Sequence, residues 1–193
     1  MSSLSDTLRR TLAPPRPDPP LPPGVPAAVV LPLIDLDPPS LLFTRRSDAV
    51  RTHKGEVSFP GGARHDEDPD LLATGLRETE EELGIAAASL EVLGALPWTP
   101  TFVSGFVVVP FVARLPERPE LTPSAAEVAE VLELDLGRLA RVERVEQREW
   151  RGAAYDTHTY RLDGHTVWGV TGRILHSMLE MLKREGWTWR ATS

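Results

Sequence analysis

The 193-residue sequence predicts an α/β sandwich, in which helices cover a sheet of mixed strand direction. Apolar runs of strand length stand at residues 27–35, 40–46 and 102–113. Towards the C-terminal end, apolar residues recur at helical spacing over residues 172–184. Strands and helices do not alternate strictly along the chain, so the pattern favours a sandwich over a doubly wound parallel sheet.

The composition is typical of one globular domain, with 41% apolar and 25% charged residues. A formal charge of −7 does not favour nucleic acid as a partner, because phosphate-backbone binding depends on clustered Lys and Arg. The absence of cysteine excludes disulfides, thiolate catalysis and cysteine-based zinc sites. Any metal must be bound by carboxylates, histidines or backbone oxygens. With no signal peptide and no apolar run of transmembrane length, we expect a cytoplasmic protein without a membrane partner.

Proline dominates a segment near the N-terminal end. We expect residues 1–26 to form a short helix, at 4–12, and then an extended polyproline arm, at 13–26. The globular domain is expected to span residues 27–193. The arm has two interpretations, a stiff connector laid over the domain, which we favour, or a ligand for an SH3-type partner.

Turn residues divide the first half of the chain into strands. The runs at 27–35 and 40–46 flank a turn-prone, proline-containing segment, so they are expected to pair as a hairpin. A third strand, at 54–59, is expected to end at Pro60-Gly61-Gly62. A further strand is expected at 89–96, before the apolar run at 102–113.

A helix expected at residues 69–83 has the most informative pattern. Asp68 suits its N-cap and Gly84 its C-terminal end. At about 100° per residue, one stripe of this helix consists of Leu72, Leu76, Thr79 and Leu83. Nearly opposite that stripe stand Glu78, Glu81 and Glu82. We therefore expect one side to pack on the core and the other to present three carboxylates.

Three carboxylates at this spacing have two interpretations. Like charges on one helix face repel, each pair costing roughly 0.2–0.5 kcal/mol. A divalent cation such as Mg²⁺ reverses that cost, since it takes carboxylate oxygens as ligands. The alternative is a solvated acidic face, which is what most charge runs are. Flanking residues favour the metal site, because Gly61-Gly62 stands upstream, Arg77 precedes the glutamates and Gly84-Ile85 follows them.

Together these residues resemble the signature of the Nudix hydrolases. The second half of the signature reads Arg77-Glu78-Thr79-Glu80-Glu81-Glu82-Leu83-Gly84-Ile85, with Thr79 at a position that is apolar in the general pattern. Fourteen residues separate Gly62 from Arg77, one more than in the pattern. The intermediate acid of the signature is therefore either Glu67 or Asp68.

The resemblance implies an α/β/α sandwich around a mixed sheet, with the signature forming a loop–helix–loop. It implies a Mg²⁺- or Mn²⁺-dependent pyrophosphohydrolase. Glu78 and Glu82 would be the firmest metal ligands, Glu81 a third ligand or a water-orienting base, and Arg77 would hold the glutamates in place. Three later acids are candidates for a distant carboxylate that completes the site or acts as base: Glu127, which we favour, Glu130 and Glu133.

The sequence before the glutamates narrows the substrate. It reads Leu42-Phe43-Thr44-Arg45-Arg46-Ser47, then Arg51, His53, Gly55 and Phe59-Pro60-Gly61-Gly62. This resembles the coenzyme A pyrophosphatase branch of the family, from which Phe43 departs, and residues 167–175 resemble that branch's closing segment. The expected substrate-binding residues are Arg45, Arg46, Arg51, His53, Lys54, Gly61 and Gly62. Arginine suits phosphate groups, although some of these residues could instead pair with surface carboxylates.

The activity that the resemblance implies is hydrolysis of coenzyme A, a small-molecule substrate, to adenosine 3′,5′-bisphosphate and 4′-phosphopantetheine. Derivatives of coenzyme A are further candidates. One alternative is a Nudix enzyme for ADP-ribose, dinucleotides or modified nucleoside triphosphates. Another is a catalytically idle domain that senses a nucleotide, although such a domain would be expected to lack metal ligands. The sequence leaves the oligomeric state open.

Overall fold

The computed structural model describes residues 3–16, 18–47, 55–101, 104–150 and 152–189. Three of the expected substrate-binding residues, Arg51, His53 and Lys54, lie outside the described residues. None of the described helices has both the length and the apolar character needed to cross a membrane.

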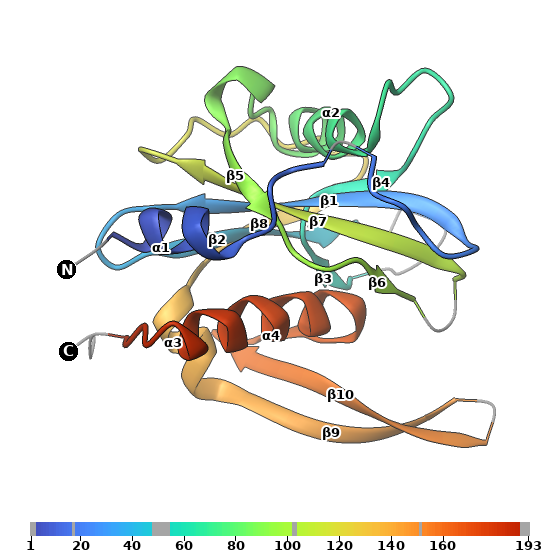
Figure 1. Ribbon diagram of the computed structural model, residues 1–193, viewed down its shortest axis with the longest axis vertical. Helices are drawn as coiled ribbons and strands as arrows, with labels where there is room; N and C mark the ends of the chain where they lie inside the picture. Colours follow the sequence, from blue (N-terminus) through green and yellow to red (C-terminus); the bar gives the residue numbers. More distant parts are fainter. Residues whose placement is uncertain (1–2, 17, 48–54, 102–103, 151, 190–193) are drawn as a thin grey trace.

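A large mixed sheet forms the middle of the molecule (Figure 1). Its main path runs β3-β2-β1-β7-β5, with β4 paired to β1, β6 to β7 and β8 to β2. The bounds are β1 Val25–Ile34, β2 Ser40–Arg46, β3 Val57–Ser58, β4 Gly61–Ala63, β5 Glu91–Ala95, β6 Thr99–Pro100, β7 Phe106–Leu115 and β8 Val128–Asp135. Strands β1 and β7 run parallel, whereas β1 and β2 pair antiparallel as the expected hairpin.

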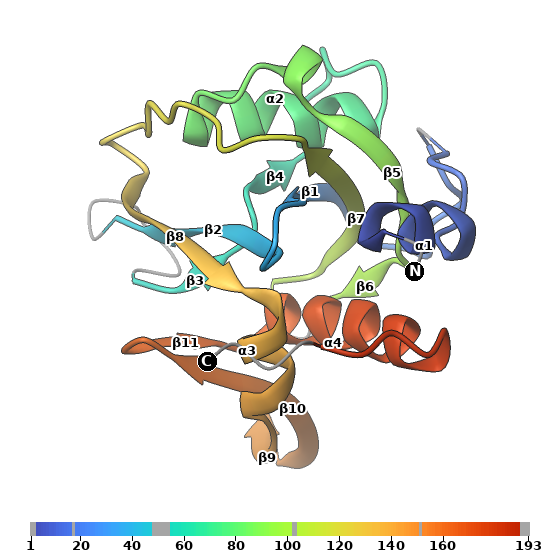
Figure 2. The same cartoon turned by 90° about the vertical axis from the view of Figure 1, so that its left-hand side faces the viewer.

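Helices cover both faces of this sheet. Helix α2 lies on one face and α4 on the other, and a second sheet of order β11-β10-β9 lies beyond α4 (Figures 1 and 2). The bounds are α2 Leu71–Leu83, a 3₁₀ turn at Ala87–Ser89, α3 Leu136–Val142, β9 Glu143–Trp150, β10 Ala153–Leu162, β11 His165–Val167 and α4 Gly169–Arg184. The predicted α/β/α sandwich around a mixed sheet is therefore confirmed.

Several contacts attach the N-terminal segment to this domain. Helix α1, Leu4–Thr11, places Leu4 and Leu8 in the main hydrophobic core. Further along, Asp18 in the proline-rich segment accepts hydrogen bonds from the backbone N–H of Leu71 at 3.1 Å and from Arg64 Nη1 at 3.0 Å. These contacts agree with a connector laid over the domain, while the division of the chain at residue 26 remains a prediction.

Two expectations about local structure are wrong. Helix α2 begins at Leu71 and its N-cap is Asp70, which accepts from the N–H of Ala73 at 2.8 Å, because the Asp68 carboxylate is used elsewhere. Gly61 and Gly62 do not simply end a strand, since they belong to β4 and pair with β1.

Two further regions differ from the pattern. The acidic stretch at Val128–Asp135 is strand β8, so Glu130 and Glu133 do not share a helix face. Helix α4 begins at Gly169, three residues before the expected start. Strands β9 and β10, between α3 and β11, correspond to no element expected from the sequence.

Candidate active site

Helix α2 packs on the large sheet through small and apolar side chains. At Gly75, a Cβ would stand 3.2 Å from Val30 Cγ2 of β1, so the helix approaches the sheet closely. Thr79 and Leu83 are fully buried, as their place in the predicted stripe requires. The Thr79 hydroxyl donates to the Gly75 carbonyl oxygen at 2.7 Å, which satisfies the one polar group in that stripe. This packing fixes the rotation of the helix and therefore the direction of its glutamates.

Arg77 is the centre of an ion-pair network at the glutamate-bearing face. Its Nη1 donates to Glu78 Oε1 and to Glu81 Oε2, each at 2.9 Å. Its Nε and Nη2 donate to the two carboxylate oxygens of Asp68, which is buried and also accepts from Thr74 Oγ1 at 2.9 Å. Hydrogen bonding to Arg77 holds the pKa of Asp68 well below its usual range. Arg77 is thereby fixed on one side and orients Glu78 and Glu81 on the other.

Glu82 is buried against Thr44 of β2, with only 4% of its surface exposed, which argues against the alternative of a fully solvated acidic face. Its Oε2 accepts a hydrogen bond from Thr44 Oγ1 at 3.3 Å. Burial, followed by the charge of Glu78, raises the pKa of Glu82 to about 8, against the opposing effect of Arg46. Crowded carboxylates of this kind offer oxygen donors, and a hard divalent cation with oxygen ligands fits the donor set.

The two glycines of β4 allow close approaches, Gly62 to Glu78 and Gly61 to the backbone of β1. A Cβ at Gly62 would stand 2.6 Å from Glu78 Oε1, so a larger residue would displace that carboxylate. At Gly61 the backbone has a φ of 153°, and a Cβ would stand 2.3 Å from the Ala28 carbonyl oxygen. Burial raises the pKa of Glu78, partly offset by Arg77. The Gly-Gly pair therefore lets the backbone of β4 pass close under the carboxylate.

The segment between β7 and β8 is bound to the C-terminal end of α2. The N–H of Thr122 donates to the Leu83 carbonyl oxygen at 3.0 Å, and the N–H of Ser124 donates to the Glu82 carbonyl oxygen at 3.1 Å. These bonds satisfy carbonyls that the helix leaves without partners. They also bring Glu127, three residues later, towards the glutamates.

Of the three candidates for the distant carboxylate, Glu127 is the one that the structure brings towards the glutamates of α2. Its charge contributes to the raised pKa of both Glu78 and Glu82, which places it close to them. Glu130 instead pairs with Arg45 at 2.9 Å. Glu133 pairs with Arg118 at 2.9 Å and accepts from Ser40 Oγ at 2.7 Å.

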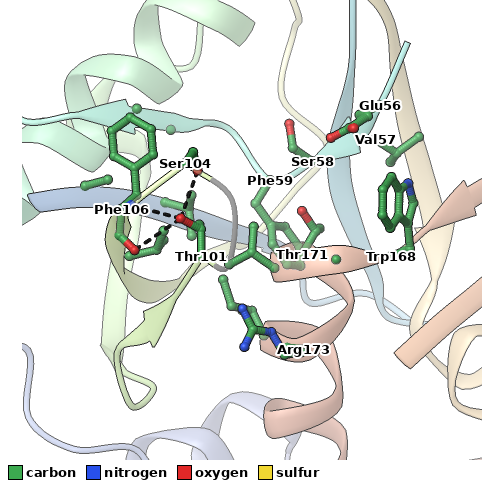
Figure 3. A pocket seen from close by; sticks show the side chains of 18 of the residues that line it. Glu56, Val57, Ser58, Phe59, Thr101, Ser104, Phe106, Trp168, Thr171 and Arg173 are labelled. Atoms are coloured by element: carbon green, nitrogen blue, oxygen red, sulfur yellow. Dashed lines mark hydrogen bonds between the residues drawn. The ribbon is translucent and has the colours of Figure 1, made fainter. Parts of the chain in front are cut away.

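A cavity of about 400 Å³ opens beside the glycines, between the large sheet on one side and β10 with the start of α4 on the other. Gly61, Gly62 and Arg46 line it, which joins it to the carboxylates. Figure 3 shows four of the larger side chains of its wall. These are Phe59, Phe106, Trp168 and Arg173. The site thus combines a carboxylate cluster with an adjoining cavity that has both aromatic and cationic walls.

Comparison with known proteins agrees with this arrangement. The model of the NUDIX domain family matches residues 24–156. The uncharacterized Nudix hydrolase NudL of Photorhabdus laumondii is 36% identical over 160 residues, 81% of this chain and 84% of the relative. This chain belongs to the Nudix hydrolase family. A NudL of Escherichia coli is 45% identical over 101 residues, covering 52% of this chain and 51% of the relative.

Solved Nudix structures share the fold at low sequence identity. The NUDIX domain of Shewanella oneidensis NrtR, solved with ADP ribose, is 14% identical with a TM-score of 0.56, over 86% of this chain and 91% of that one. The MutT protein of Methanosarcina mazei is 17% identical with a TM-score of 0.54, over 88% of this chain and all of that one. Members of the family hydrolyse pyrophosphate bonds and generally use divalent metal ions.

In this Nudix hydrolase, the expected site residues fall into three groups. The structure brings together Arg77, Glu78, Glu81, Glu82, Glu127, Arg46, Gly61 and Gly62. Arg45 lies apart from them, in its ion pair with Glu130. Arg51, His53 and Lys54 lie outside the described residues.

Sequence reasoning missed part of the cavity wall. Tyr155 on β10 lines the cavity, and no motif marks its position in the sequence. Trp168 and Arg173 also line it, and the resemblance of residues 167–175 to the family's closing segment was the available signal.

Proposed function

We propose that this chain hydrolyses the pyrophosphate bond of coenzyme A, and of coenzyme A derivatives, to adenosine 3′,5′-bisphosphate and 4′-phosphopantetheine with Mg²⁺ or Mn²⁺. The observation that carries the proposal is the junction at Gly62, which lines the cavity and lies against Glu78. A diphosphate placed at this junction meets the carboxylate cluster, while the two halves of the substrate extend along the cavity.

Glu78, Glu81 and Glu82 would hold the metal, with Glu127 as a further ligand or as the base. The bound ion would neutralise charge on the diphosphate oxygens and lower the pKa of an attacking water. The chain's own contribution is positioning, because phosphoryl transfer needs orientation and electrostatics more than covalent help. Asp68 fixes Arg77, and Arg77 in turn holds the carboxylates of Glu78 and Glu81.

Arg46 is the best-placed cation for the substrate phosphates. It lines the cavity, and its Nε is buried without a hydrogen-bond partner among the described residues. A buried donor of this kind indicates capacity for an anionic ligand. Arg45 is less suited, because its Nε is engaged by Glu130 at 2.9 Å.

The wall away from the carboxylates suits the rest of the substrate. Phe59, Phe106, Tyr155 and Trp168 give it aromatic surface, on which an adenine ring or the pantetheine chain can pack. The sequence pattern at residues 42–62 supports coenzyme A over other diphosphates, since it resembles the coenzyme A pyrophosphatase branch.

A metal-dependent hydrolysis assay tests the proposal. The purified chain with Mg²⁺ or Mn²⁺ is incubated with coenzyme A, acetyl-coenzyme A, ADP-ribose, NADH and nucleoside triphosphates, and the products are separated by chromatography. Adenosine 3′,5′-bisphosphate formed from coenzyme A, with little turnover of the others, is the expected result. Turnover of ADP-ribose or a triphosphate in place of coenzyme A would refute the proposed substrate but would still support pyrophosphohydrolase activity. Silence on the whole panel would favour a nucleotide-sensing domain.

A further inference from the structure

Two histidines and a glutamate converge on the opposite side of the molecule from α2. Glu143 begins β9, His158 and Tyr160 belong to β10, and His176 belongs to α4. In the β9–β10 pair Glu143 stands opposite Tyr160, and His158 lies two residues away on the same face of the sheet. None of these residues belongs to the Nudix signature or lines the cavity beside Gly61 and Gly62.

Three polar side-chain atoms of this cluster lie within hydrogen-bond distance of one oxygen, Glu143 Oε1. Glu143 Oε1 lies 2.8 Å from His158 Nδ1, 2.7 Å from His176 Nδ1 and 3.1 Å from the Tyr160 hydroxyl. A carboxylate oxygen has two lone pairs, so three donors exceed what it accepts well. Two imidazole nitrogens that aim at one oxygen are better explained as lone-pair donors to a shared cation.

The two imidazole rings stack on each other beside Glu143. Their centroids are 3.6 Å apart and their planes differ by 12°, so the two Nδ1 lone pairs run nearly parallel, and both rings must turn about their Cβ–Cγ bonds to converge on one ion. Helix α4 cannot move away easily, because it packs tightly on β10: a Cβ at Gly172 would stand 2.2 Å from the His158 carbonyl oxygen. The three ligand atoms lie within 4.8 Å of one another.

We propose that Glu143, His158 and His176 bind a divalent transition-metal ion of the Zn²⁺ type. Two imidazoles and one carboxylate are donors that Zn²⁺ takes readily, whereas Mg²⁺ prefers oxygen alone. At Zn–ligand distances of about 2.1 Å, tetrahedral ligand atoms stand about 3.4 Å apart, so the two Nδ1 atoms, now 2.8 and 2.7 Å from Glu143 Oε1, must separate from it slightly as the rings turn. Tyr160 donates to the ligating carboxylate and orients it from behind.

The surroundings give the ion access and a structural role. His176 lines a second cavity, of about 610 Å³, which leaves room for ion entry and for a water in the fourth position. The ion would tie β9, β10 and α4 together. Thr157 and Arg173, close along the chain to the two histidines, line the wall of the substrate cavity. The bound ion would therefore stiffen that wall from behind.

The probe is Co²⁺, titrated into the chelator-stripped full chain in the presence of excess Mg²⁺ and then displaced by Zn²⁺. Four-coordinate Co²⁺ with nitrogen ligands absorbs visible light far more strongly than six-coordinate Co²⁺ with oxygen ligands, which separates this site from the carboxylates of α2. We expect one saturable equivalent with strong absorption, abolished by Zn²⁺. Absence of that absorption in the folded protein overturns the proposal.

Substitutions locate the signal. His158→Gln and His176→Gln should each weaken Co²⁺ binding by at least about 100-fold, and Tyr160→Phe by about 10-fold. His165→Gln, on β11, is the matched histidine control and should bind as the wild type does. Glu82→Gln should also retain the signal. Loss of the signal in Glu82→Gln, or its survival in both histidine variants with native circular dichroism, overturns the assignment.

Discussion

Asp68 and Arg77 face each other through two parallel hydrogen bonds, from Nε to Oδ1 at 2.9 Å and from Nη2 to Oδ2 at 3.0 Å. Paired contacts of this kind fix the plane of the guanidinium as well as its position. The remaining nitrogen, Nη1, then donates to both Glu78 and Glu81. Asp68 thus controls two proposed metal ligands without touching the metal.

Asp68→Asn should lower turnover by about 10- to 100-fold while the fold is kept, because Arg77 loses its anionic partner and no longer holds the glutamates. Mg²⁺ affinity should fall together with the rate, a readout that a purely structural role would not move. Asp68→Glu should recover part of both. Glu67→Gln, an exposed neighbour, is the matched control. Wild-type rate and Mg²⁺ affinity in a folded Asp68→Asn protein would contradict the positioning role.

Glu78→Gln and Glu82→Gln should each lower turnover by at least about 100-fold, since each removes a charged metal ligand. The control is Glu80→Gln, an exposed glutamate on the same helix, which should keep the wild-type rate. Steady-state hydrolysis at saturating metal measures the effect. Equal rates in Glu82→Gln and Glu80→Gln would remove the buried glutamate from the mechanism.

Glu127→Gln should lower turnover more than Glu133→Gln does, because Glu127 lies near the carboxylates of α2 whereas Glu133 pairs with Arg118. If Glu127 is the base, Glu127→Gln lowers the rate constant at saturating metal. If Glu127 is a metal ligand, the substitution mainly raises the metal concentration that is needed for activity. Rates measured across a Mg²⁺ series separate the two. An effect no larger than that of Glu133→Gln would assign the distant carboxylate elsewhere.

Gly62→Ala should impair hydrolysis through displacement of Glu78, since the added Cβ would stand 2.6 Å from Oε1. The double variant with Glu78→Gln tests this route. Where one substitution acts through the other, their effects on the activation free energy are not additive. We expect Gly62→Ala to cost at least about 10-fold in the wild type and much less in the Glu78→Gln background. Equal costs in both backgrounds would contradict the mechanism.

The stability of the metal-free protein should depend on Glu82. Its pKa is raised from 4.5 to about 8 in the folded state, mainly by burial, so the folded protein binds the proton more tightly than the unfolded one. The resulting stabilisation is fully present below about pH 4.5 and is lost as the pH rises through about 8. The Glu82→Gln variant does not undergo this loss of stability. As the pH rises from about 4.5 to about 8, the unfolding free energy of the variant minus that of the wild type should therefore increase, by roughly a few kcal/mol at most.

Denaturant unfolding in EDTA at a series of pH values measures this difference, and the titrating groups that do not interact with Glu82 cancel because both proteins share them. Addition of Mg²⁺ should restore the wild type at high pH, since the ion binds the ionised carboxylate. A difference between the two proteins that does not change with pH would show that Glu82 ionises normally.

Local sequence patterns predicted much of the fold, because periodicity and turn residues act over a few neighbours. The β1–β2 hairpin and the buried positions Thr79 and Leu83 follow from such patterns. The capping pattern predicted the wrong N-cap where a side chain nine residues away takes the capping carboxylate. Asp68 resembles a helix N-cap in the sequence, but its carboxylate is taken by Arg77, and Asp70 caps the helix instead.

The sequence by itself determined the chemistry that this Nudix hydrolase carries: the glutamates of α2, the arginine among them and the glycines before them all lie within one short stretch of chain. Only the tertiary structure decided which of these groups is buried and what they meet. Glu82 is buried against Thr44 because α2 packs on β1 and β1 pairs with β2, and Glu127 is brought near by the backbone contact of residues 122–124 with the end of that helix. The cluster of Glu143, His158 and His176 likewise depends on three elements that no local pattern connects.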